Sequence, residues 1–197
     1  MWDLDPDSLP GPDGYPDYFF RCCWNIITGD FERTVRDFFT SRSMPLGMNN
    51  NLLVLIPKIN GDMSLDKFRP LCMGNFFCKV ISKILATRLS FLPRLISEEQ
   101  RSFQKGKLIH NNIALASKLA NIMHSSIRGG RLGAKIDIQK AFDTISWDFI
   151  LKALKKFGFF DIWLKWISQI LSTSKISILL NGGPVGYFGV ERGSLSR

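Results

Sequence analysis

The sequence contains few of the side chains that build zinc sites and disulfide frameworks. Its 197 residues include four Cys and two His, and no two Cys have the Cys-x-x-Cys spacing of a zinc ligand pair. A structural zinc site is therefore not expected. The Cys residues fit reduced core thiols of an intracellular protein, and they are Cys22, Cys23, Cys72 and Cys78.

Long apolar runs are also missing. Lys79 and Lys83 interrupt the most apolar stretch, so no segment is long enough to span a bilayer. Residues 1–5 have neither the positive charge nor the apolar run of a signal peptide. We therefore expect a soluble intracellular protein without membrane attachment, and nothing in the sequence distinguishes nucleus from cytoplasm or predicts an oligomeric state.

Charge is unevenly distributed along a chain whose composition is otherwise that of a globular protein. Hydrophobic residues make up 45% and charged residues 22%, and the length suits one ordinary domain or a piece of a larger protein. The formal net charge is +9, but residues 1–30 carry six Asp and one Arg, which leaves +14 for the remainder. Such a basic body favours a polyanionic partner, although any single Lys or Arg is better explained as a solvated helix face.

Local patterns predict an α+β fold. Residues 6–16 hold four Pro and two Gly, which favours turns, and we expect a flexible acidic leader over residues 1–16. Apolar residues at helical spacing follow, and shorter apolar or alternating runs indicate strands. The predicted helices are 17–28, 30–42, 75–89, 109–125, 146–157 and 162–171, and the predicted strands are 52–56, 68–71, 132–138, 175–180 and 185–190.

The stretch at residues 132–143 carries the main candidate for metal chemistry. Apolar and polar residues alternate before Asp137, which places this carboxylate on the polar face of the predicted strand. A tight turn and then a helix follow, with Ser146 as its cap and Gly158 after its end. A carboxylate beside free turn amides suits Mg²⁺ with a polyphosphate. Taken alone, an Asp near a strand end is more often a solvated residue or a turn former.

Three other places carry residues suited to phosphate or nucleic acid. Lys58 follows a short apolar strand, and Arg69, held before Pro70, offers a planar guanidinium group that matches phosphate. Residues 97–107 place basic side chains around Phe103, a combination that suits a nucleic-acid strand. On local grounds a solvated loop residue is the stronger interpretation of Lys58, and a plain surface loop is the alternative for residues 97–107.

Seven short motifs occur in an order that identifies a family. This order resembles the reverse transcriptase of non-LTR (LINE-type) retrotransposons, especially those of plants, and the resemblance extends from about Pro10 to Gly193. Each motif alone is weak, whereas seven in order are specific. They are Pro-Gly-Pro-Asp-Gly (10–14), Leu-Ile-Pro-Lys (55–58), Phe-Arg-Pro-Leu (68–71), Lys-Val-Ile-Ser-Lys-Ile-Leu-Ala-Thr-Arg-Leu (79–89), Ile-Ser-Glu-Glu-Gln-Arg-Ser-Phe-Gln-Lys-Gly-Lys (96–107), Lys-Ile-Asp-Ile-Gln-Lys-Ala-Phe-Asp (135–143) and Leu-Asn-Gly-Gly-Pro-Val-Gly (180–186).

The resemblance implies roles for the residues around the central motif. Asp137 would be the first carboxylate of the palm that binds Mg²⁺, and the Ile138 carbonyl would help to hold a cation. Backbone amides around Lys140 and Ala141 would meet the triphosphate of a dNTP. Phe142 would exclude the ribose 2′-hydroxyl. The implied reaction is the nucleotidyl transfer of an RNA-directed DNA polymerase.

The resemblance also implies roles for residues earlier in the chain. Lys58 and Arg69 match finger residues that grip the phosphates of the incoming nucleotide. Gln100, Phe103 and Gly106 fall in the segment that lies near the template. The implied partners are an RNA template, a DNA primer and a dNTP.

The motifs stop before the remaining carboxylates of the family. After Glu191-Arg192-Gly193 the family pattern would continue with Leu or Phe and then Arg-Gln-Gly-Asp-Pro, whereas here Ser194 follows, and no Asp-Asp pair occurs anywhere in the chain. We expect a flexible leader (1–16), a fingers-like region (17–130) and a partial palm (131–197) of a right-hand polymerase, truncated and inactive alone. The alternatives are a non-catalytic nucleic-acid-binding remnant and a non-functional gene fragment.

Overall fold

The computed structural model describes residues 4–59, 61, 64–97, 99–102, 106–123, 132–136 and 144–193. The chain forms two compact units, of which the first comprises residues 1–85 and 140–197 and the second residues 86–139. The two units are described separately. Helices and strands both occur within the first unit, and the predicted α+β class is confirmed.

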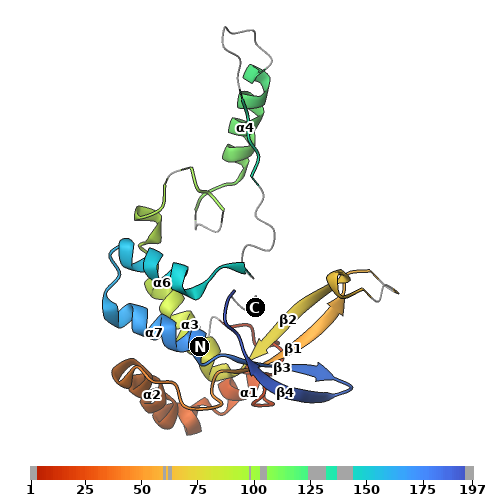
Figure 1. Ribbon diagram of the computed structural model, residues 1–197. Coiled ribbons are helices and arrows are strands. Elements are labelled where there is room, and N and C mark those ends of the chain that lie inside the picture. Colours follow the sequence, from red (N-terminus) through yellow and green to blue (C-terminus); the bar gives the residue numbers. More distant parts are fainter. Residues whose placement is uncertain are drawn as a thin grey trace. The chain divides into compact units, whose positions relative to one another are not determined.

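Four strands of the first unit form one mixed sheet in the order β2-β1-β3-β4 (Figure 1). The strands are β1 (Asn50–Pro57), β2 (Phe68–Gly74), β3 (Lys175–Leu180) and β4 (Gly183–Gly189). β1 is antiparallel to β2, and β3 is antiparallel to β4, so each pair is a hairpin. β1 runs parallel to β3 over residues 50–53, which joins two hairpins that are far apart in the sequence.

The turn between β3 and β4 follows from its sequence. Asn181 and Gly182 have φ angles of 48° and 83°, both in the left-handed region. A two-residue hairpin loop with both φ positive requires residues that tolerate this conformation, and Asn-Gly is the favoured pair. The predicted hairpin is therefore confirmed, with slightly different strand ends.

One hydrophobic core joins three helices of the first unit. α2 (Trp24–Ser41) contributes Phe38, and α3 (Phe76–Arg88) contributes the apolar stripe that includes Ile81, whose side chain is fully buried. α7 (Asp161–Ser172) packs against this core through its Trp and Ile residues, and the Trp166 indole N–H donates to the Phe39 carbonyl at 3.1 Å. Apolar residues at helical spacing predicted α3 and α7, and both are confirmed.

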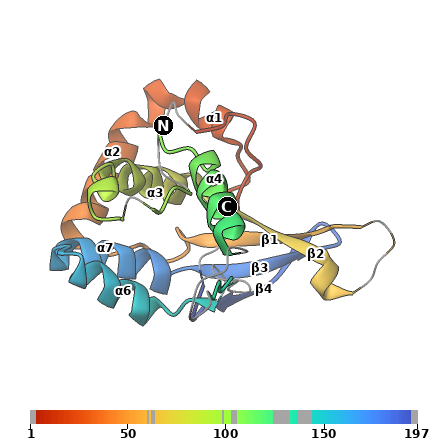
Figure 2. The same cartoon turned by 90° about the horizontal axis from the view of Figure 1, so that it is seen from above.

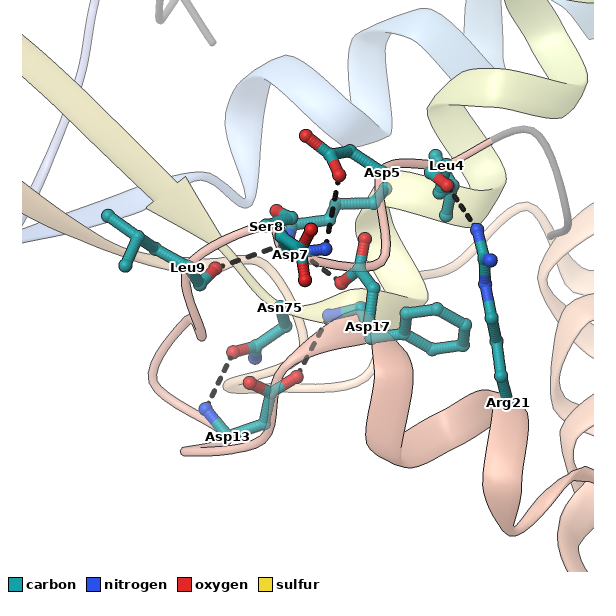
Figure 3. Close-up of polar contacts among 11 residues, drawn as sticks. Leu4, Asp5, Asp7, Ser8, Leu9, Asp13, Asp17, Arg21 and Asn75 are labelled. Atoms are coloured by element: carbon teal, nitrogen blue, oxygen red, sulfur yellow. Dashed lines mark hydrogen bonds and ion pairs between the residues drawn. The ribbon is translucent and has the colours of Figure 1, made fainter.

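The segment before α1 (Asp17–Cys22) is tied to the start of α3 (Figure 3). The Phe76 N–H donates to the Asp13 carboxylate at 2.8 Å, so a residue 63 positions earlier satisfies an open N–H of this helix terminus. The Asp13 N–H donates to the Asn75 side chain at 3.0 Å. A Cβ atom on Gly11 would lie 2.5 Å from the Gly74 backbone, so only glycine fits there. The Pro-Gly-Pro-Asp-Gly motif therefore has a structural function.

A buried ion pair strengthens the same connection. The Lys79 ammonium contacts Asp17 at 2.9 Å, and only 13% of the Lys79 side chain and 2% of the Asp17 side chain are exposed. Lys79 also donates to the Ser8 hydroxyl at 2.6 Å and to the Leu9 carbonyl at 3.3 Å. All three ammonium protons thus have acceptors, which a buried charge requires. α1 and α3 are joined through this cation.

Two predicted elements differ in the structure. The first two helices are divided at Cys23, not near Gly29, so α2 begins at Trp24. In the second unit, residues 132–136 belong to no strand, and Leu132 and Ile136 are 96% and 85% exposed. Alternation indicates which face a strand would bury, but a strand forms only where a neighbour pairs with its backbone. The predicted strand is wrong for these described residues.

The remaining helices agree with their predictions. α4 (His110–Met123) lies in the second unit, and α6 (Trp147–Lys156) lies in the first. The Ser146 hydroxyl accepts from the Phe149 N–H at 3.2 Å, as its predicted capping role requires.

The predicted boundary at residue 130 separates strands that share one sheet, and the division into leader, fingers-like and palm regions stays a prediction. None of the helices in the described part of the chain is long and apolar enough to cross a membrane.

Candidate functional site

The β1–β2 hairpin brings Lys58 and Arg69 together. Arg69 pairs directly with Ile56, and the Lys58 N–H donates to the Lys67 carbonyl at 2.7 Å, which continues the ladder by one step. Direct partners share a face of an antiparallel pair, and so do residues two apart on one strand. Lys58 and Arg69 therefore lie on the same face, two ladder steps apart, and both are exposed.

The hairpin tip carries a third cation that the sequence analysis missed. Lys67 lies beside Lys58 in the ladder, and its ammonium is 3.9 Å from the Asp66 carboxylate, with both side chains well exposed. The Lys58 ammonium donates to the Asp66 carbonyl at 2.9 Å. By sequence, residues 58–69 hold three cations and two Asp, Asp62 and Asp66, and this formal net charge of +1 attracts anions. Only the hairpin register could have revealed Lys67, because nothing in its local pattern marks it.

The hairpin tip extends past the shared part of the sheet. β1 pairs with β3 only over residues 50–53, whereas residues 54–57 continue in register with β2 (Figure 1). β2 is an edge strand, which accommodates Pro70, a residue without an N–H to donate. The aliphatic run before Pro57 thus supports a projecting two-stranded arm with its cations near the end.

Gln100 lies in the second unit, in a loop held to α4. The Gln100 N–H donates to the Ser97 carbonyl at 3.2 Å, and its side-chain amide donates to the Ser102 carbonyl at 3.4 Å. The Asn112 amide donates to the Glu99 carbonyl at 2.9 Å, which anchors the loop to the first turn of α4. The Gln100 side chain therefore makes a weak local contact at an exposed position.

Two further features of this loop are the backbone conformation of Gly106 and the charge of Glu99. Gly106 has a φ of 80°, which favours glycine, and a Cβ there would have nothing within 4 Å. Hydrogen bonds from the Glu99 backbone N–H and the Ser97 hydroxyl lower the pKa of Glu99, and the nearby charges of Lys107 and Arg101 lower it further. The loop therefore leaves space beside Gly106, and its Glu99 carboxylate stays ionised to a lower pH than usual.

The central motif is outside the part of the chain that the structure describes. This applies to the predicted metal ligands and nucleotide contacts Asp137, Ile138, Lys140, Ala141 and Phe142, and to the template contact Phe103. Among the described residues, no three His, Cys, Asp or Glu side chains come together to hold a metal ion. The roles assigned to these six residues stay predictions, as do the template contacts assigned to Gln100 and Gly106.

Comparison with known proteins gives matches along most of the chain. The family of reverse transcriptases (RNA-dependent DNA polymerases) matches residues 56–194. The Transposon TX1 uncharacterized 149 kDa protein of Xenopus laevis is 27% identical over 179 residues, which are 89% of this chain and 13% of that protein. The Pol polyprotein from the type-1 retrotransposable element R2 of Nasonia vitripennis is 29% identical over 149 residues, 76% of this chain and 14% of that protein. The chain thus spans about a seventh of the length of these relatives.

Proposed function

Because the chain belongs to the reverse transcriptase family, we propose that its β1–β2 arm grips the triphosphate of an incoming dNTP during RNA-directed DNA synthesis. The predicted resemblance to a non-LTR retrotransposon reverse transcriptase is confirmed. The observation that carries the proposal is the register that brings Lys58 and Arg69 to one face of the arm. An RNA template and a DNA primer would be the other partners.

The chemistry of the arm supports a phosphate ligand. Arg69 offers a planar fork of donors that fits two phosphate oxygens, whereas Lys58 acts as a mobile point charge. The Lys58 ammonium now donates to the neutral Asp66 carbonyl, a bond that a phosphate oxygen can replace. Lys67 would add a third positive charge at the same tip. The arm therefore combines one planar guanidinium group, that of Arg69, with two flexible ammonium groups, those of Lys58 and Lys67.

The palm residues would complete the site. Asp137 and the Ile138 carbonyl are oxygen ligands of the type that Mg²⁺ prefers, and the bound ion would stabilise charge on the reacting phosphate. The amides of Lys140 and Ala141 would contact the triphosphate, and Phe142 would contact the sugar. Gln100, Phe103 and Gly106 would contact the template.

We further propose that these 197 residues do not polymerise alone. The sequence contains no Asp-Asp pair, so the carboxylates that the family places beside Asp137 are missing from it. Primer extension on an RNA template with Mg²⁺ and all four dNTPs tests this. We expect no incorporation above that of an Asp137→Asn variant, and clear incorporation by the unmodified chain would contradict the proposal.

Nucleotide binding tests the arm directly. By calorimetry with Mg²⁺ present, dTTP should bind the chain, whereas thymidine, which lacks phosphates, should not. Replacing Arg69 by Gln should weaken dTTP binding by about 10–100-fold, because a hydrogen bond to a charged group contributes about 1.5–3 kcal/mol. Arg36→Gln removes the same charge from an exposed position of α2 and serves as the control. Equal weakening by both variants would contradict a specific grip.

A non-catalytic nucleic-acid-binding role is the alternative that the net charge of +9 supports. An RNA–DNA hybrid would then bind with an affinity that falls steeply as salt rises, because bound phosphates release counterions. Hybrid binding without dTTP binding would favour this alternative. Absence of hybrid binding at low salt would exclude it.

A further inference from the structure

A groove lies between α6 and α7, away from the arm described above. It has a volume of about 370 Å³, with Leu151 and Leu164 among its lining residues. Three of the other lining residues are Lys152, Lys155 and Lys165. Figures 1 and 2 both show α6 and α7 at the opposite end of the first unit from the tip of the β1–β2 hairpin. A ligand in this groove would therefore not overlap with a nucleotide held by the arm.

The positive charge of the groove is only partly compensated. The Lys152 ammonium is 2.7 Å from Asp148, and the Lys155 ammonium is 3.6 Å from Asp161. Each of these four side chains is more than 70% exposed, and exposed ion pairs are weak and easily exchanged. Lys165 has no ion pair among the described residues. A phosphate chain can thus bind here without breaking a strong contact.

The turn between the two helices presents exposed aromatic rings. Phe160 is 84% exposed and directly precedes Asp161, which lines the groove. Phe157, at the other end of the turn, is 53% exposed. Rings with this much exposure contribute little to the hydrophobic core. Aromatic rings next to a positively charged groove are the combination that binds single-stranded nucleic acid, because bases stack on the rings while cations follow the phosphates.

We propose that the α6–α7 groove binds single-stranded nucleic acid, with phosphates on Lys155 and Lys165 and a base stacked on Phe160. The ligand class follows from the two features together, since an acidic peptide would satisfy the lysines but would not need the ring. The site goes beyond the proposed nucleotide grip. It would hold a part of an RNA or DNA strand that is distant from the incoming nucleotide.

The salt dependence of binding tests the phosphate contacts. Fluorescence anisotropy of a labelled oligouridylate and of a labelled oligo(dT) gives the affinity of the full chain at several salt concentrations. The Lys155→Gln/Lys165→Gln variant should lower the slope of log affinity against log salt by roughly 1.4, because each phosphate contact on a single strand contributes about 0.7. Lys156→Gln/Lys175→Gln, which removes two exposed charges outside the groove lining, should change the slope less.

Substitution of Phe160 tests the stacking contact. Phe160→Ala should weaken binding about fivefold or more, as loss of one base–aromatic stack does. Phe160→Trp should keep the affinity, and saturating oligonucleotide should quench its fluorescence relative to the unmodified chain. Because Phe160 is exposed, both variants should melt as the unmodified chain does, which far-UV circular dichroism checks.

Two results would overturn the proposal. One is an equal change of slope in the groove variant and its control, which would mean that the lysines act only through overall charge. The other is competition by polyglutamate as effective as that by oligouridylate, together with unchanged binding by Phe160→Ala, which would identify a site for acidic peptides. Binding of dTTP is measured separately at Arg69, so failure of this proposal does not depend on failure of the nucleotide grip.

Discussion

Replacing Lys79 by Met should be among the most destabilising single changes in the first unit. The substitution keeps much of the length of the side chain but removes the charge that the Asp17 carboxylate contacts. Asp17 would stay 1% exposed with its counter-ion gone, and Ser8 and Leu9 would lose a donor as well. Breaking one side of a buried pair is costly because the other charge remains in a medium of low polarity.

The size of the effect follows from this burial. Removing one partner of a buried ion pair costs about 3–5 kcal/mol of folding free energy. For a chain of 150–250 residues, each 1 kcal/mol lowers Tm by about 2–4 °C, so Tm should fall by roughly 6–20 °C. The Lys79→Met/Asp17→Leu variant removes both charges and should regain more than half of the loss.

Urea unfolding, followed by circular dichroism and by tryptophan fluorescence, measures these differences. Coincident transitions by both probes justify the comparison of free energies. Lys156→Met makes the same substitution at an exposed position of α6 and should cost less than about 0.5 kcal/mol. The reasoning is refuted if Lys79→Met costs less than 1 kcal/mol, or if the double variant is no more stable than the single one.

Three further predictions concern other contacts. Asp13→Ala should cost about 1–2 kcal/mol in the same urea experiment, because it removes the acceptor of the Phe76 N–H, whereas an unchanged stability would show that the cap is not needed. Ser146→Ala should cost about 1 kcal/mol, and Ser146→Asp, which can also cap, should largely restore stability. The hydrogen bond and charge of Cys22 raise the pKa of Tyr18, so NMR titration should show that the Tyr18 phenol ionises at lower pH in Cys22→Ala. The stability that comes from this raised pKa is present below pH 10.0 and is lost as pH rises through the raised pKa. An unchanged Tyr18 titration would contradict that assignment.

The helices were the most predictable part of the fold. α7 and α3 were predicted by apolar residues at helical spacing, and α6 by Ser146 before its first turn and by Gly158 after its end. These signals are local, so they survive in any tertiary context that buries the same face. The division of the first two helices at Cys23 was missed because Gly29 is the stronger helix breaker by propensity, and packing overrides propensity.

Contacts between distant segments could not be predicted. Asn75 holds the position before α3, but its side chain accepts from the Asp13 N–H and donates to the Gly47 and Met48 carbonyls instead of capping its own helix. A turn-rich composition excludes a helix from the leader but does not show what the leader contacts. Likewise, nothing in the runs around Leu53 and Ile178 indicates that these strands lie side by side.

In the candidate site, too, the features set by local sequence were predictable and those set by distant contacts were not. Motif order identified Lys58 and Arg69, and the register of one hairpin, which is also local, explains why they share a face. Lys67 was missed because its role depends on that register and not on its neighbours in sequence. The α6–α7 groove was missed because its lysines come from two helices, each of which shows only an ordinary solvated face.

The parallel contact between β1 and β3 has a consequence for biosynthesis. The first hairpin ends at Gly74 and β3 begins at Lys175, so the inner edge of β1 has no strand to pair with until residue 175 has been synthesised. Unpaired edges with aliphatic side chains invite association between nascent chains. We therefore expect this chain to need chaperones during translation and to refold slowly, because the β1–β3 pairing is so distant in sequence.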